Sequence, residues 1–210
     1  MTYFQPSLWI LKYMFFIFIN LILTGKYRIM KIKSLTIYCS HSDNLDQEFY
    51  NLAEEIGYFL GKNKISLIYG GGNSGLMGKV SNVALKNGST VIGIIPEFLK
   101  KGENINYNIS KIIVVQTMAE RKKILFDKGD AFLILPGGSG TIEEATEIIS
   151  WKFLGLHSKP IIIFNFKNYW KSLYNLYENS KKLHFSNKNL QSISINIKTL
   201  TKFKSLFINE

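Results

Sequence analysis

The sequence predicts an α/β fold, in which a doubly wound parallel β-sheet lies between two layers of helices. Two observations lead to this fold class. From residue 34 onward, short apolar runs alternate with segments of helical spacing, and the connections between them are short. The two glycine-rich loops of the chain each stand between an apolar run and a helical segment, which is where parallel sheets bind their ligands.

Each element follows from its local pattern. Six runs are apolar at nearly every position, as parallel strands covered on both faces are, and are predicted to be strands: Leu35–Cys39, Ser66–Tyr69, Val91–Ile95, Ile112–Val115, Ala131–Leu135 and Pro160–Asn165. Five segments have helical spacing and are predicted to be helices: Phe49–Leu60, Gly75–Asn87, Met118–Lys128, Thr141–Gly155 and Tyr169–Lys182. The tail from Lys181 is polar and weakly patterned, so we expect a short peripheral helix or a loosely packed end.

Residues 30–210 are predicted to form a single domain, which an apolar N-terminal extension, residues 1–29, precedes. The apolar run 8–25 is close to the length of a membrane-spanning helix, but Lys12 and Asn20 inside it would be costly near the bilayer centre. It also lacks the basic start and the cleavage site of a signal peptide. Because the fold pattern begins directly after Met30, we interpret the extension as lying outside the native fold. Membrane contact is expected only if residues 8–25 are a true anchor.

The formal net charge of +11 does not predict a nucleic-acid-binding protein. The excess of basic residues lies at the two ends, while the stretch 30–150 holds equal numbers of basic and acidic residues. The C-terminal lysines stand singly, without the arginine clusters or interleaved aromatic residues that bind nucleic acid. We interpret them as a solvated face.

Cysteine and histidine usage gives no sign of a disulfide or a metal site. Cys39 is the only cysteine, which excludes an internal disulfide and favours a reducing compartment such as the cytoplasm. The three histidines, His41, His157 and His184, lie far apart and lack metal-ligand spacing.

The first glycine-rich loop, Tyr69-Gly70-Gly71-Gly72-Asn73-Ser74-Gly75-Leu76-Met77-Gly78, connects a predicted strand to a predicted helix. Consecutive glycines let a ligand approach the backbone, and free N–H groups at a helix start attract anions. The alternative is a tight turn whose glycines only permit close packing. The loop does not fit the dinucleotide fingerprint, which follows the first strand, because the first strand here ends in Cys39-Ser40-His41-Ser42.

The second glycine-rich loop, Leu135-Pro136-Gly137-Gly138-Ser139-Gly140-Thr141-Ile142-Glu143-Glu144, has the same position and adds two carboxylates. It therefore predicts a second anion site. The alternative is a capping box between Thr141 and Glu144, which stabilises a helix start without catalysis. A capping box, however, does not require the preceding Pro-Gly-Gly-x-Gly.

A third motif, Met118-Ala119-Glu120-Arg121-Lys122, begins the helix between these two loops. Arg121 and Lys122 oppose the helix dipole there, and a broken local rule of this kind is typical of functional sites. The alternative is that both are solvated surface residues.

The three motifs together resemble the LONELY GUY family, the cytokinin riboside 5′-monophosphate phosphoribohydrolases. The resemblance extends from about Lys33 to Asn165 and includes the segments Val91–Pro96 and Trp151–His157. Members have been labelled lysine decarboxylases, but no lysine of this chain stands in a recognisable pyridoxal-phosphate context. The first strand departs from the family pattern, because many members have Cys-Gly-Ser where this chain has Cys39-Ser40-His41.

The resemblance implies a Rossmann-like homodimer without metal or organic cofactor. It implies hydrolysis of purine riboside 5′-monophosphates, either AMP or its N6-modified cytokinin relatives, to free base and ribose 5-phosphate. Arg121 and Glu144 are the implied catalytic pair. The glycine loops would hold the phosphate, through Gly71, Gly72, Gly75, Gly137, Gly138, Ser139, Gly140 and Thr141. Lys122 and Glu143 are expected substrate contacts, and Glu103 and Ser150 are weaker candidates.

A second function class stays open. The fold and the glycine loops would also suit a non-catalytic carrier of a nucleotide or of the molybdenum cofactor. A carrier needs the loops but not the pair Arg121 and Glu144, so the presence of both favours the enzyme.

Overall fold

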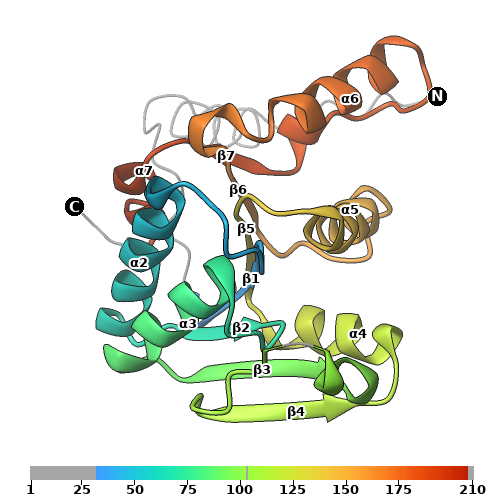
Figure 1. Ribbon diagram of the computed structural model, residues 1–210. Coiled ribbons are helices and arrows are strands. Elements are labelled where there is room, and N and C mark those ends of the chain that lie inside the picture. Colours follow the sequence, from blue (N-terminus) through green and yellow to red (C-terminus); the bar gives the residue numbers. More distant parts are fainter. Residues whose placement is uncertain (1–31, 103, 208–210) are drawn as a thin grey trace, which may run out of the picture.

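The computed structural model describes residues 32–102 and 104–207 of the chain (Figure 1). Within them, seven parallel strands form one sheet in the order β4-β3-β2-β1-β5-β6-β7. The strands are β1 (Ser34–Tyr38), β2 (Ser66–Tyr69), β3 (Val91–Pro96), β4 (Lys111–Val115), β5 (Ala131–Ile134), β6 (Ile161–Phe164) and β7 (Ile195–Ile197). From β1 in the centre of the sheet the described chain winds outward to β4, and it returns to β5 beside β1. The predicted doubly wound sheet is confirmed.

Helices cover both faces of the sheet, so the molecule has the three predicted layers. The α-helices are α2 (Gln47–Lys62), α3 (Gly75–Lys86), α4 (Met118–Lys128), α5 (Ser139–Phe153), α6 (Lys171–Lys182) and α7 (Leu200–Lys204), with 3₁₀ turns η1 (Glu97–Lys101), η2 (Phe166–Asn168) and η3 (Leu190–Ser192). Figure 1 shows α2, α3 and α7 on one side of the sheet and α4 and α5 on the other. The two faces have separate cores.

The interior strands form because their side chains are apolar toward both layers. Alternate residues of β5 divide between the cores: Ala131 and Leu133 pack under α2 and α3, and Phe132 and Ile134 pack under α4 and α5. All four are fully buried. β-branched and aromatic residues in such a run favour the strand over the helix. The edge strand β4 is less covered, and Val114 there is exposed.

The prediction for the C-terminal tail was partly wrong: a short helix is present, but it packs into the core, and a strand precedes it. Residues Ile195–Ile197 form the seventh strand, paired in parallel with β6, and α7 follows directly. Phe203 and Leu206 are fully buried in the core under α2. The sequence did not indicate β7 or the buried position of α7, because each of these short elements buries few side chains and the residues around them are polar.

Searching the described residues for long apolar helices finds no candidate membrane span. The apolar run 8–25, for which an anchor was considered, lies outside the described residues.

Candidate active site

Two charged side chains meet between α4 and α5, near the carboxyl ends of β1, β2 and β5. Arg121 lies in the first turn of α4, and Glu144 lies in the second turn of α5. The Nη2 atom of Arg121 is 3.9 Å from Oε1 of Glu144, and these side chains are only 7% and 10% exposed. The two helices thus hold an arginine and a glutamate together in a largely water-excluded place.

The start of α4 is stabilised in spite of its basic residues. The hydroxyl of Thr117, the N-cap residue, accepts a hydrogen bond from the N–H of Glu120 at 3.1 Å. The carboxylate of Glu120 accepts one from the N–H of Gln116 at 2.8 Å and places a negative charge in the first turn. This cap and this charge offset the unfavourable position of Arg121 and Lys122 at the positive end of the helix dipole.

The buried pair is not satisfied by the protein itself. At 3.9 Å the contact between Arg121 and Glu144 is too long for a hydrogen bond. Among the described residues, Nε of Arg121 has no hydrogen-bond partner either. Because buried donors are normally paired, a guanidinium in this state is suited to donate hydrogen bonds to oxygen or nitrogen atoms of a ligand.

Burial raises the pKa of Glu144 from 4.5 to about 7. The positive charge of Arg121 opposes this shift, while the negative charge of Glu143 adds to it. A carboxyl whose pKa lies near neutrality can both release and take up a proton, which is the requirement for a general acid or base.

This pKa predicts a change of stability with pH. The folded protein keeps a proton on Glu144 that the unfolded chain releases above pH 4.5, so the stability from this proton is full below 4.5 and lost as pH rises through about 7. Glu144→Gln stays neutral, so from about pH 5 to about pH 8 it should gain on the order of 3 kcal/mol of unfolding free energy relative to wild type. Urea unfolding of both proteins at the two pH values measures the gain. A difference that does not change with pH would contradict the raised pKa.

Lys122 joins the two helices beside the pair. Its Nζ atom lies 2.6 Å from Oε1 of Glu143 and 3.0 Å from Oε1 of Glu147. Hydrogen bonds to the two carboxylates raise the pKa of Lys122. Lys122 and Glu143, both predicted to contact substrate, contact each other in this structure. Sequence reasoning missed Glu147, although it stands four residues after Glu143 and so on the same face of α5.

The second glycine-rich loop has the properties of an anion site. Within residues 32–102 and 104–207, no hydrogen bond uses the N–H groups of Ser139, Gly140 and Thr141, which open α5. A methyl group built at Gly138 or Gly140 would meet no atom within 4 Å. Neither the backbone conformation nor the packing of the chain requires glycine at these two positions, and the missing side chains leave the N–H groups open to a ligand.

Gly137 and Thr141 have an internal role. A methyl group at Gly137 would lie 2.2 Å from the hydroxyl oxygen of Thr141, so the Thr141 side chain packs directly on this glycine. The capping-box alternative is wrong, because α5 begins at Ser139 with Gly138 as its N-cap residue. Thr141 lies inside the helix, two residues after the start, and Glu144 faces Arg121 instead of the helix start.

The first glycine-rich loop differs from the predicted anion site. The N–H of Gly75, the first residue of α3, donates a 2.8 Å hydrogen bond to the carboxylate of Asp43. The next two N–H groups, of Leu76 and Met77, donate to the carbonyl oxygen of Ser40 at 3.0 and 3.2 Å. The chain itself therefore occupies the start of α3, and Gly75 has no free N–H for a phosphate.

Gly71 and Gly72 are buried under the segment 104–106. The carbonyl of Gly71 accepts from the N–H of Asn106 at 3.0 Å, and Gly72 forms a bridge with Ile105. Gly71 has φ +85°, which explains glycine at that position. For this loop, the close-packing alternative describes the geometry better than the phosphate-binding prediction does.

Two weaker candidates are not placed at the pair. Ser150 is exposed on α5, six residues after Glu144, which is roughly 9 Å along the helix and about 120° around it. Glu103 lies outside the described residues.

Comparison with known proteins gives the family. Residues 77–204 match the family described as "Possible lysine decarboxylase". A protein of Rhodococcoides fascians named cytokinin riboside 5′-monophosphate phosphoribohydrolase is 39% identical over 149 residues, which are 70% of this chain and 75% of that protein. A protein of Arabidopsis thaliana with the same enzyme name is 38% identical over 143 residues, which are 68% of this chain and 67% of that protein.

The chain belongs to the LONELY GUY family. Solved structures agree on its fold. The molybdenum cofactor carrier protein of Chlamydomonas reinhardtii superposes with a TM-score of 0.62 at 16% identity, covering 82% of this chain and 93% of that one. The molybdenum cofactor binding protein of Rippkaea orientalis gives 0.59 at 18% identity, covering 85% and 99%. At these identities the likeness shows the Rossmann-like fold alone.

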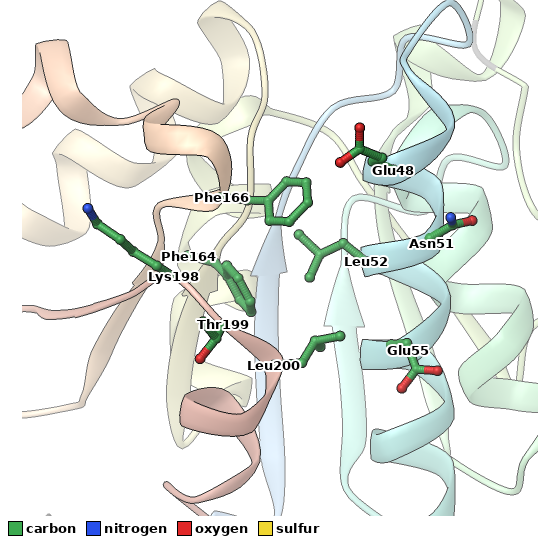
Figure 2. A pocket seen from close by; sticks show the side chains of 9 residues that line it. All are labelled: Glu48, Asn51, Leu52, Glu55, Phe164, Phe166, Lys198, Thr199 and Leu200. Atoms are coloured by element: carbon green, nitrogen blue, oxygen red, sulfur yellow. The ribbon is translucent and has the colours of Figure 1, made fainter.

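A separate cavity of this LONELY GUY protein lies away from Arg121 and Glu144. It measures about 340 Å³ and is lined by residues of α2, of the end of β6 and the start of η2, and of the segment 198–200 that leads into α7 (Figure 2). Two carboxylates at this cavity are already paired with lysines, Glu48 with Lys167 and Glu55 with Lys204. It is on the opposite face of the sheet from α4 and α5, and neither member of the pair lines it.

Proposed function

We propose that this chain hydrolyses the N-glycosidic bond of a purine ribonucleoside 5′-monophosphate, releasing free base and ribose 5-phosphate. One observation carries the proposal: Glu144, buried beside an arginine whose Nε has no hydrogen-bond partner among the described residues, lies less than two turns of helix from the unbonded N–H groups that open α5. An anion site and a proton-transfer group at this spacing suit a phosphorylated substrate. The relatives from R. fascians and A. thaliana are named for this reaction on cytokinin nucleotides.

The phosphate is proposed to bind at the start of α5. The N–H groups of Ser139, Gly140 and Thr141 donate to its oxygens, and the positive end of the helix dipole favours its charge. Gly138 and Gly140 let the phosphate reach the backbone, because neither has a side chain in the way. Binding energy from this remote group can position the reacting bond.

Glu144 is proposed to act at the ribose. Breaking the bond between C1′ and the base nitrogen leaves the electron pair on the base and a positive charge on the sugar. The ionised carboxylate stabilises that charge and takes a proton from water, whose oxygen forms the new bond to C1′. The departing base takes up a proton from solvent. The pKa of about 7 leaves a large fraction of Glu144 ionised at neutral pH.

Arg121 is proposed to hold the departing group or the sugar hydroxyls. Its Nε has no hydrogen-bond partner among the described residues, and its charge keeps the carboxyl of Glu144 from an even higher pKa. The free donor can stabilise the electron pair that the base takes with it, and the ionised carboxylate can stabilise the positive charge on the sugar.

Discrimination between nucleotide and nucleoside tests this proposal. The purified protein should release adenine from AMP at least about 100-fold faster than from adenosine, because two or more charge-assisted hydrogen bonds to phosphate contribute roughly 1.5–3 kcal/mol each. Gly138→Ala should reduce kcat/KM for AMP toward the value for adenosine and change the adenosine value little. Equal rates on AMP and adenosine would show that the start of α5 does not bind the substrate phosphate.

The base is expected to matter less than the phosphate. A hydrophobic substituent on N6 contributes only about 1–3 kcal/mol to discrimination, so we propose activity on both AMP and cytokinin nucleotides. The rates on AMP and on isopentenyladenosine monophosphate, measured side by side, give the preference.

We also propose that the active unit is a cytoplasmic homodimer of residues 30–210. Leu154 and Leu156, which follow α5, are 71% and 68% exposed, and such a patch suits contact with a second copy. The buried, free thiol of Cys39 is compatible with a reducing compartment. Sedimentation equilibrium of the protein beginning at Met30 tests the oligomeric state.

A further inference from the structure

Gly70 lies against the guanidinium of Arg121. It follows β2 directly and is buried, and its φ angle is not in the left-handed region. A methyl group at Gly70 would lie 2.4 Å from Nη2 of Arg121 and 3.5 Å from its Cζ. The backbone conformation therefore does not require glycine here, but the position of the arginine does.

The neighbouring glycines have different reasons to be glycine. A methyl group at Gly75 would lie 2.5 Å from the carbonyl oxygen of Ser42, and one at Gly78 would lie 1.9 Å from the carbonyl oxygen of Asn73. Both conflicts are with backbone, so these two glycines serve the packing of α3. Of these three glycines in the first glycine-rich loop, Gly70 is the one whose closest conflict is with the end of a charged side chain.

Packing has to hold Arg121 in place, because hydrogen bonds do not. Among the described residues, its Nε has no partner, and its closest charged neighbour, Glu144, stays 3.9 Å from Nη2. A guanidinium without such bonds can be displaced when an atom is added beside it, because no hydrogen bond fixes its position. The bare Cα of Gly70 therefore forms one wall of the space that the guanidinium occupies.

We propose that Gly70 is a positioning residue: the absence of its side chain sets the distance from the guanidinium of Arg121 to Glu144. In this proposal the first glycine-rich loop positions the catalytic arginine, and the second loop binds the phosphate. This inference rests on the proposed function for its effect on rate, although the position of the arginine can be tested without it.

Gly70→Ala is the decisive variant, because its conflict is with a flexible side chain and the protein should still fold. We expect kcat for base release from AMP to fall at least about 10-fold, while KM changes less than about 3-fold, because the phosphate site is untouched. The pKa seen on the acid side of the kcat profile should rise, since the charge that lowers the pKa of Glu144 has moved away.

Gly129→Ala is the matched control. Gly129 directly follows α4, at the far end of the helix from Arg121, and a methyl group there would lie 2.3 Å from Oγ1 of Thr36. The closest approach is about as short as at Gly70, the carbonyl oxygen of Ala131 adds a second contact at 3.0 Å, and both lie away from the pair. Gly129→Ala should lower the melting temperature and leave kcat and the pH profile of the folded protein at their wild-type values.

A double-mutant cycle on stability separates this inference from the proposed function. If the added methyl group meets only the guanidinium, Gly70→Ala should lower the melting temperature in wild type but not in an Arg121→Ala background. Crystal structures of wild type and Gly70→Ala should show Cζ of Arg121 displaced from Glu144. Additive melting-temperature losses, or an unmoved arginine, would overturn the inference. A wild-type protein inactive on every nucleotide, with the cycle as expected, would overturn only the proposed function.

Discussion

Replacing Glu144 by glutamine is expected to lower kcat for base release from AMP by a factor of about 10²–10⁴. Glutamine has nearly the same volume, so the packing between α4 and α5 is kept. It cannot carry the negative charge that stabilises the sugar cation or accept the proton of water. Arg121→Ala should cause a loss of similar size, because it removes the only other charged group of the pair. Steady-state kinetics with detection of free adenine measures both.

Glu54→Gln is the control for this prediction. Glu54 is half exposed and pairs with Lys79 on the surface, 2.7 Å away, where such a pair contributes little. Its kcat should equal the wild-type value. Glu144→Gln with more than about a third of the wild-type rate would show that the buried carboxylate is not catalytic.

Replacing Phe203 by alanine is expected to cost about 3–5 kcal/mol of unfolding free energy. Phe203 is fully buried in α7, and its ring lies 5.4 Å from that of Phe59 and 5.0 Å from that of Phe207. Removing the ring leaves a cavity between α2 and α7. Phe185, which is 83% exposed, provides the comparison, since Phe185→Ala should change the free energy by less than about 0.5 kcal/mol.

Urea unfolding followed by far-UV circular dichroism measures both phenylalanine variants. Equal midpoints for Phe203→Ala and wild type would mean that the C-terminal tail does not belong to the cooperative core. In that case the tail would be loosely packed, as its polar sequence predicts.

Much of the sheet could be predicted because its strands are continuous apolar runs. The seventh strand could not, since Ile195-Asn196-Ile197 is too short for any periodicity and its neighbours are polar. What fixes it is the pairing of Ile162 with Ile195, across 33 positions of sequence, and the burial of Ile197. Such a contact becomes visible only when β6 is in place.

The site was predicted to the extent that its chemistry is local in sequence. Arg121 and Glu144 could be singled out by their motifs, and the structure brings them together. The partners of the first loop could not be found in this way. Asp43 bonds to Gly75 from 32 residues away, and Gly70 is constrained by Arg121 from 51 positions further along the chain. A glycine motif alone does not show whether a side chain must be absent because of a ligand, a helix or an arginine.

Hydrolysis at the buried pair is tested most directly by the identity of the products. AMP should be incubated with the protein in ¹⁸O-enriched water, and adenine and ribose 5-phosphate quantified over time. Hydrolysis should give equal amounts of the two products, with one ¹⁸O atom at C1′ of the sugar, and Glu144→Gln should give neither product. AMP that binds and is recovered unchanged would contradict the account and identify the protein as a nucleotide carrier.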